Sequence, residues 1–261
     1  MRKAARLRMS EGDTLAARCR VLADTGFEGL DVATPSDIDV AELAAAASES
    51  GVEVANVLAA RSLHSMLADA DPAVRRHGRE GLELSLRDAS ALGASSVLLP
   101  ALLPANADEA TARANTRDEL GRVLPLAEEL DVRVAVESCP NGFLLSAEEL
   151  AEFVDGFGSP YVTVHFDVGN AQPFGPPAKW IATLGPRIHK VDFKDYSSER
   201  AAVGGLDYGQ AIGLGEGDCD WPAVVAALDG IGYSGWVSAE LPGAGRELLA
   251  ATSAAMDVMF A

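Results

Sequence analysis

Short apolar runs alternate with longer amphipathic stretches along the whole chain. Each short run ends near Gly, Pro, Asn or Asp, and a segment with helical periodicity follows it, which is typical of alternating strands and helices. The predicted strands span residues 4–9, 28–33, 52–58, 96–100, 132–137, 161–167, 188–193 and 236–241. The predicted helices span residues 13–25, 38–50, 72–92, 108–130, 146–157, 177–184, 221–230 and 244–260.

Eight strand and helix pairs in 261 residues predict a single-domain (β/α)8 TIM barrel over residues 1–261. A doubly wound open sheet is the structural alternative, and it normally carries a Gly-rich phosphate turn after its first strand. Here the corresponding residues 10–13 are Ser-Glu-Gly-Asp, which are acidic and contain one glycine. Since no linker or shift in composition divides the chain, we assign one domain.

The composition excludes several classes of partner. A formal net charge of −18 argues against binding to nucleic acid, which needs Lys and Arg to displace counterions, and against an anionic membrane surface. Cys19, Cys139 and Cys219 are far apart and form no disulfide framework, which favours the reducing cytoplasm. The N-terminal residues 1–14 lack the apolar segment of a signal peptide.

Four predicted strands end in an acid on the face opposite their apolar face: Glu137, Asp167, Asp192 and Glu240. In residues 132–137, for example, three valines share one face and Glu137 lies on the other, because side chains alternate along a strand. The apolar face suits packing against helices. We therefore expect the acids to point into the barrel at the carboxyl ends of the strands, where barrel enzymes place their chemistry.

Four carboxylates at one rim would repel one another in a partly dry site, and a divalent cation would remove that conflict. An all-oxygen ligand set favours Mn²⁺ or Mg²⁺ over Zn²⁺. The alternative is that each acid is an ordinary strand-end cap or ion-pair partner. In the seventh strand, the alternation places His189 on the face opposite Asp192, unless a bulge shifts the register.

Four segments carry a resemblance to a known family: GFEGLDV, VAVES, FDVGNA and GLGEGDCDWPAVVAALDGIGYSGWVSAE, at residues 26–32, 134–138, 166–171 and 213–240. The chain resembles the sugar phosphate isomerase/epimerase family of xylose-isomerase-like barrels. The intervening helices fit as well, so the resemblance covers nearly the whole chain.

The resemblance implies that Glu137 and Glu240 are metal ligands that also act as acid and base, and that Asp167 is a further ligand. The family often has a His in the seventh strand where this chain has Asp192. Since some subgroups have Asp there, we keep Asp192 as the fourth ligand, with His189 as the fallback.

Three residues are expected to bind substrate. His64 lies where the family often has a substrate-facing His, and Asn170 replaces the His that often follows the sixth-strand Asp. Lys194 shares the inward phase of Asp192 and could bind a substrate oxygen, or it could pair with the acids of the rim. The long polar stretch 195–220 is expected to cover the mouth as a lid.

The leading hypothesis is a metal-dependent isomerase or epimerase of a keto-sugar or related hydroxy-carbonyl compound, acting through an enediolate with Glu137 and Glu240 as acid and base. A lyase or hydrolase of an oxidised sugar or glycoside is the main alternative. A sugar-binding barrel without activity and an abasic-site endonuclease are further alternatives. The expected partner is a small sugar, and by analogy with other barrels the chain should form a homodimer or homotetramer.

Overall fold

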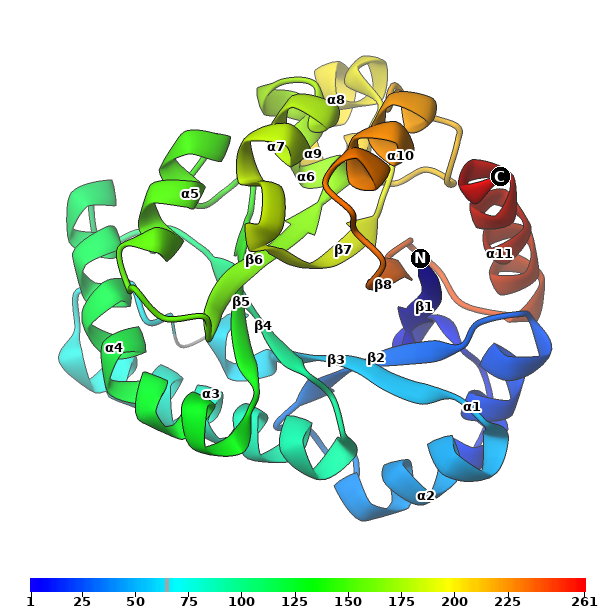
Figure 1. Ribbon diagram of the computed structural model, residues 1–261, viewed down its shortest axis with the longest axis horizontal. Coiled ribbons are helices and arrows are strands. Elements are labelled where there is room, and N and C mark those ends of the chain that lie inside the picture. Colours follow the sequence, from blue (N-terminus) through cyan, green and yellow to red (C-terminus); the bar gives the residue numbers. More distant parts are fainter. Residues whose placement is uncertain (64–65) are drawn as a thin grey trace.

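The chain forms a closed barrel of parallel strands in its computed structural model, which describes residues 1–63 and 66–261. The strands pair in sequence order, and β8 pairs with β1 to close the barrel (Figure 1). This closure confirms the predicted TIM barrel and excludes the open doubly wound sheet. The strands are β1 (Arg2–Arg6), β2 (Gly29–Thr34), β3 (Glu53–Ala59), β4 (Ser96–Ala101), β5 (Arg133–Ser138), β6 (Val162–Asp167), β7 (Ile188–Phe193) and β8 (Trp236–Ala239).

Helices surround the barrel and connect consecutive strands (Figure 1). Most of the α-helices begin at residues whose side chains accept hydrogen bonds from the first turn, such as Ser146 and Asp220. None of the helices in the described ranges is long and apolar enough to cross a membrane. The α-helices are α1 (Leu15–Asp24), α2 (Val40–Ser50), α3 (Pro72–Leu92), α4 (Glu109–Leu130), α5 (Ala147–Asp155), α6 (Val168–Ala171), α7 (Pro177–Leu184), α8 (Ser198–Gly204), α9 (Leu206–Gly209), α10 (Trp221–Gly230) and α11 (Arg246–Phe260), and the 3₁₀ helices are η1 (Leu7–Met9), η2 (Ala60–Leu63), η3 (Gln172–Phe174) and η4 (Gly185–Arg187).

The first strand starts two residues earlier than predicted and ends three residues earlier. Arg2 pairs with Trp236 of β8, and Leu7–Met9 forms a 3₁₀ turn rather than strand. The charged side chain of Arg2 reaches Glu53, with an N–O distance of 2.7 Å. These contacts at the rim of the barrel extend β1 to charged residues at its start. A prediction from hydrophobicity alone therefore starts the strand too late.

The two faces of the strands differ in chemistry. Outward residues such as Val134 and Val136 are fully buried against the helices and form the apolar core. Several inward residues are polar or charged, including Asp31, His165 and Lys190, and each is at most 1% exposed. Because barrel interiors are ordinarily filled by bulky branched residues, this interior is unusual in holding buried charge.

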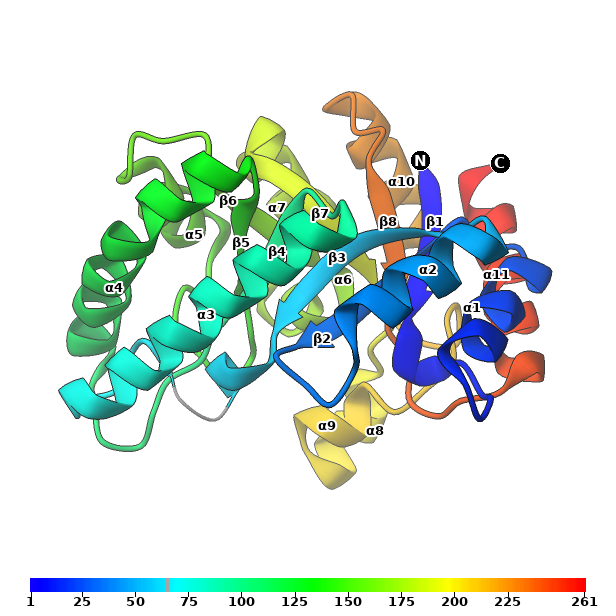
Figure 2. The ribbon, with the colours of Figure 1, turned by 90° about the horizontal axis from the view of Figure 1, so that it is seen from below.

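Two short helices lie over the carboxyl ends of the strands. Figure 2 shows α8 and α9 at the end of the barrel opposite the N-terminus, where the strands finish. Asp195 anchors the base of this segment, since its carboxylate accepts hydrogen bonds from the backbone N–H of Gly215 (2.8 Å) and the indole N–H of Trp221 (3.0 Å). The expected lid at 195–220 is therefore a partly helical segment, fixed to the barrel at its base.

Candidate metal centre

Four carboxylates meet at the mouth of the barrel. Glu137 lies on β5, Asp167 ends β6, Asp192 lies on β7 and Glu240 directly follows β8. One oxygen from each of the four lies within 4.8 Å of those of the others. The first three side chains are buried, and the side chain of Glu240 is 21% exposed. The phase argument from sequence thus identified the residues that converge, and the group could hold a metal ion.

The strand register explains the convergence. Asp167 pairs with Asp192 across β6 and β7, so both acids stand at the same height. The register between these strands shifts beside His165, which marks a bulge opposite His189. The His189 ring nitrogen Nε2 lies 3.0 Å from the hydroxyl of Ser95, just before β4 begins. His189 therefore lies near the amino ends of the strands, away from the four acids, and the fallback assignment of His189 as a ligand is wrong.

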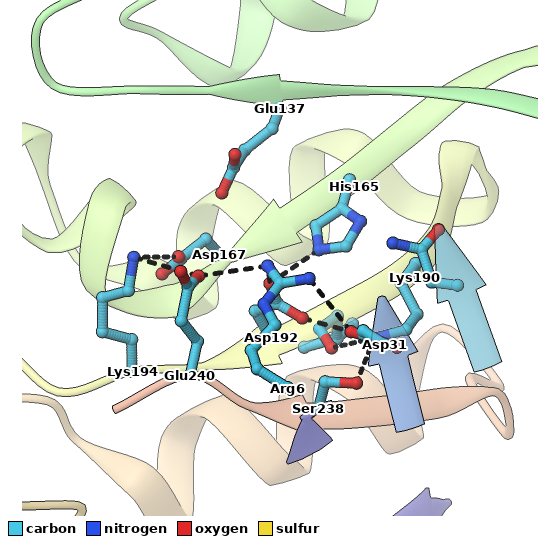
Figure 3. A network of polar contacts seen from close by, with 12 residues as sticks. Arg6, Asp31, Glu137, His165, Asp167, Lys190, Asp192, Lys194, Ser238 and Glu240 are labelled. Carbon is cyan, nitrogen blue, oxygen red and sulfur yellow. Dashed lines mark hydrogen bonds and ion pairs between the residues drawn. The ribbon is translucent and has the colours of Figure 1, made fainter. Parts of the chain in front are cut away.

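Arg6, which the sequence analysis did not single out, lies at the centre of the network (Figure 3). Its guanidinium donates to Asp31 (3.1 Å) and Glu240 (3.1 Å), and it also pairs directly with Asp192. Arg6 has the inward phase of β1, and its side chain is only 3% exposed. A charged residue in the inward phase of a predicted strand is the signal that could have identified it.

Two lysines complete the network: Lys190 lies in β7, and Lys194 directly follows it. The Lys194 ammonium lies 2.8 Å from Asp167 and 3.3 Å from Glu240. One layer deeper, the Lys190 ammonium donates to Ser238 (2.6 Å) and lies 3.3 Å from Asp192. The expectation that Lys194 sits at the rim is confirmed, and its contacts are with the acids.

The four acids divide into two electrostatic pairs. Burial, followed by the negative charge of Asp167, raises the pKa of Glu137 well above its usual value, and burial also raises the pKa of Asp167. Burial opposes ionisation of Asp192 and Glu240 too, but their positive neighbours together outweigh it and hold the pKa of both below the usual range. Arg6 is the largest of these neighbours for both acids, joined by His165 and Lys190 at Asp192 and by Lys194 at Glu240. At Glu137 and Asp167, the nearby positive charge is thus too small to offset the effect of burial on the pKa.

The formal charge of the network matches a divalent cation. Among the described residues, it contains five carboxylates: the four acids of the mouth and Asp31. Three buried cations face them, Arg6, Lys190 and Lys194, and His165, whose Nε2 lies 2.9 Å from Asp192, is counted as neutral. The formal balance is therefore −2, and the deficit lies at Glu137 and Asp167. An all-oxygen donor set with this deficit could hold a divalent metal ion.

Asn170 is held in place beside the acids. Asp167 begins helix α6 by accepting a hydrogen bond from the Asn170 backbone N–H (3.0 Å). The Asn170 amide then donates to Glu137 (3.0 Å), and its oxygen accepts from Gln210 (2.7 Å). Asn170 therefore orients Glu137 and links it to Gln210 of the lid segment. His64, which was also expected to bind substrate, lies outside the described residues.

A cavity of about 520 Å³ opens above the acids. Its floor includes Glu137, Lys194 and Glu240, while residues 204–207 and 210 of the lid segment line its outer side. A volume in this range suits a small organic ligand. The expected lid therefore contributes to the wall of the cavity that Glu137 and Glu240 line.

Gly169 permits the close approach of α6 to β7. A Cβ atom built on Gly169 would lie 2.8 Å from the backbone oxygen of Lys194. We expect Gly169→Ala to displace Lys194, to lower the melting temperature and to reduce kcat/KM by up to about 100-fold, as small displacements in active sites can do. Gly121→Ala is the control, because a Cβ there meets nothing within 4 Å and should stabilise α4 by about 0.5–1 kcal/mol. Equal melting temperatures and rates for both variants would contradict this role.

His189 should make stability depend on pH. Burial, and then the charge of Arg133, lowers the pKa of His189 to about 4 from the ordinary value of 6.5. The unfolded chain therefore takes up this proton first, so the contribution of neutral His189 is complete above about pH 6.5 and declines as the pH falls toward 4. The shift corresponds to about 3 kcal/mol. Urea unfolding between these pH values should show a smaller loss of stability for His189→Gln than for the unchanged protein, and identical losses would refute the assignment.

Comparison with known protein families gives a match over most of the chain. The family model described as xylose isomerase-like TIM barrel matches residues 19–260. A putative L-ribulose-5-phosphate 3-epimerase of Escherichia coli is 28% identical over 198 residues, which cover 74% of this chain and 68% of the relative. A putative hydroxypyruvate isomerase of Homo sapiens is 26% identical over 247 residues, which cover 87% and 83%. An uncharacterised protein of Methanocaldococcus jannaschii is 27% identical over 135 residues, so this chain spans 42% of its length.

Solved structures share the fold. A D-tagatose 3-epimerase-like protein superposes with a TM-score of 0.84 at 20% identity, covering 99% of this chain and 97% of that one. An L-ribulose 3-epimerase gives a TM-score of 0.83 at 20% identity, covering 99% and 94%. IolI protein with a bound zinc atom gives 0.83 at 15% identity, covering 100% and 98%. At these identities the likeness establishes the barrel architecture.

Proposed function

Because the chain belongs to the xylose isomerase-like TIM barrel family, we propose that it is a metal-dependent isomerase or epimerase of a keto-sugar or related hydroxy-carbonyl compound. The observation that carries this proposal is the group of four carboxylates at the mouth of the barrel, with ligand oxygens within 4.8 Å of one another. The names of the relatives agree with it, since they include a putative sugar-phosphate 3-epimerase and a putative hydroxypyruvate isomerase.

Glu137, Asp167, Asp192 and Glu240 would hold one divalent ion, with Mn²⁺ or Mg²⁺ favoured by the oxygen donors. When bound, the ion would polarise a substrate carbonyl and stabilise the negative charge that develops on its oxygen. The other parts of the reaction fall to the side chains of the chain itself.

Glu137 and Glu240 are proposed as the two groups that remove and return a proton at carbon. They project from β5 and from the end of β8, so a substrate lying over the acids would have one glutamate on each side. The raised pKa of Glu137 and the lowered pKa of Glu240 set the two carboxyl groups apart. Such a pair, with environments that push the pKa values in opposite directions, suits an acid and a base acting on one enediolate.

Asn170 and Lys194 are proposed to position the reacting groups. Asn170 fixes the orientation of Glu137 through its 3.0 Å hydrogen bond. Lys194 lies between Asp167 and Glu240 and lines the cavity, where its ammonium could donate to a substrate oxygen. The lid residues that line the cavity would limit the access of water during proton transfer.

Proton exchange in D₂O tests the proposed reaction. The Mn²⁺-loaded protein should exchange the hydrogen next to the carbonyl of a ketose for deuterium and produce the isomer or C3 epimer, which NMR detects directly. Elimination or hydrolysis products in the same spectra would support the lyase or hydrolase alternative instead. A failure to exchange deuterium into any member of a panel of ketoses and hydroxy-carbonyl compounds would count against the proposal.

The compartment and the oligomeric state are further parts of the proposal. The three cysteines are free and buried, which is compatible with a reducing cytoplasm. The sugar would be the principal partner, and the homodimer or homotetramer expected by analogy remains a prediction that light scattering can test.

A further inference from the structure

The two sides of the cavity above the acids differ in chemistry. One side carries charged groups, which are Arg6 of β1, Glu137 of β5, Lys194 after β7 and Glu240 after β8. The other side is apolar and consists of leucines from β3, η2, β4, the segment after β4, and α9: Leu58, Leu63, Leu98, Leu102 and Leu206. In a closed barrel of eight strands, β3 stands opposite β7 and β4 opposite β8. Leu58 of β3 and Leu98 of β4 therefore lie across the barrel from β7 and from Glu240, which directly follows β8.

The positive charges of the cavity are already engaged. Arg6 and Lys194 are the cations among the described lining residues. Arg6 pairs with Asp31, Asp192 and Glu240, and Lys194 lies 2.8 Å from Asp167. Asp207 adds a further negative charge at the lid. A phosphate at the remote end of a substrate would thus meet apolar side chains and carboxylates, and its desolvation would be poorly compensated.

We propose that the substrate carries an apolar group at the end remote from the reacting carbons, and that this group packs on the leucines of β3, β4 and α9. The proposal rests on the proposed function, because it takes the carboxylate side as the site of reaction. The substrate class is then a hydroxy-carbonyl sugar with an alkyl or aryl substituent rather than a sugar phosphate. Leu206 extends the apolar side onto the lid, so the same group would contact the segment that covers the mouth.

Three ketose probes that differ only in the group on O6 test this inference. The probes are 6-O-benzyl-D-fructose, 6-O-methyl-D-fructose and D-fructose 6-phosphate, and in all three O6 is blocked, so their ring forms are matched. NMR titration of the Mn²⁺-loaded protein gives each dissociation constant without requiring turnover. We expect the benzyl ether to bind about 10-fold or more tightly than the methyl ether, and the phosphate to bind more weakly than either.

Leucine variants test whether the preference for the benzyl ether depends on the apolar side of the cavity. Leu102→Gln and Leu206→Gln should each reduce the preference for the benzyl ether over the methyl ether. Leu103→Gln is the matched control, since Leu103 is 37% exposed and neighbours Leu102 but does not line the cavity. Leu206 is also 37% exposed, so its replacement should leave the fold unchanged, which circular dichroism can verify.

The outcomes separate this inference from the proposed function. Equal affinities, tightest binding of the phosphate, no binding of the benzyl ether, or a preference unaffected by both variants would overturn it. If the benzyl preference depends on the leucines while no ketose exchanges deuterium, the substrate class stands and the proposed reaction falls.

Discussion

Glu137→Gln is expected to abolish turnover, lowering kcat by about 10²- to 10⁴-fold, the range usual for the loss of a general acid or base. Gln retains the shape of the side chain and can still accept the hydrogen bond that Asn170 donates to Glu137. Because burial raises the pKa of Glu137, its charge opposes folding in the metal-free protein at neutral pH. The variant should therefore be at least as stable as the unchanged protein without metal, while losing activity and metal affinity.

Glu240→Gln should lose turnover to a similar degree but should also lose stability. Arg6 and Lys194 stabilise the charged form of Glu240, which is why the pKa of Glu240 is lowered. A carboxylate with a lowered pKa contributes stability above its unfolded pKa, so at pH 7 that contribution disappears in the variant. Removal of a charged hydrogen-bonding partner costs about 1.5–3 kcal/mol.

Steady-state rates of the Mn²⁺-loaded protein measure turnover in the two variants, and urea unfolding in the presence of a chelator measures their stability. The opposite signs of the stability changes distinguish this account from a general disturbance of the barrel mouth. Full activity in either variant would remove that glutamate from the mechanism. Equal losses of stability in both would contradict the electrostatic description of the site.

Arg6→Met is expected to give the largest loss of stability of any substitution considered. The guanidinium of Arg6 contacts three carboxylates, Asp31, Asp192 and Glu240. Breaking a buried ion pair from one side leaves uncompensated charge and costs about 3–5 kcal/mol. For a chain of this size, that corresponds to a fall in melting temperature of roughly 6–20 °C. Saturating Mn²⁺ should restore part of the loss, because it would supply positive charge to the same acids.

Arg8→Met serves as the matched control for Arg6. Arg8 also approaches Glu240, at 3.5 Å, but its side chain is 53% exposed. Exposed ion pairs contribute about 0–1 kcal/mol, so the melting temperature should change little. If Arg6→Met lowered the melting temperature as little as Arg8→Met, or if Mn²⁺ failed to stabilise the Arg6 variant, Arg6 would not compensate the charge of the acids as described.

The acids were predictable from sequence because strands impose a strict alternation. Glu137 and Asp167 end runs whose other phase is entirely apolar, and the alternation of eight short apolar runs with helical stretches predicted the barrel. Residue phase was enough to select four side chains on separate strands. Their mutual distances depend on closure and register, which the structure supplies.

Other features could not be read from a local pattern. The bulge beside His165 changes the register of β7, and a single sequence carries no marker for it. The role of Arg6 depends on partners 25, 186 and 234 residues away in the chain. Likewise, the leucine side of the cavity is formed by residues from the strands and from the lid segment together. In the sequence, each of these leucines taken alone is indistinguishable from an ordinary core residue.

The central claim is that one divalent ion is held by Glu137, Asp167, Asp192 and Glu240. A crystal of the protein soaked in Mn²⁺, with data collected at the manganese absorption edge, tests it most directly. The account predicts a single strong anomalous peak in contact with carboxylate oxygens of these four residues. A map without a peak there, or with manganese bound only at other sites, would contradict the account.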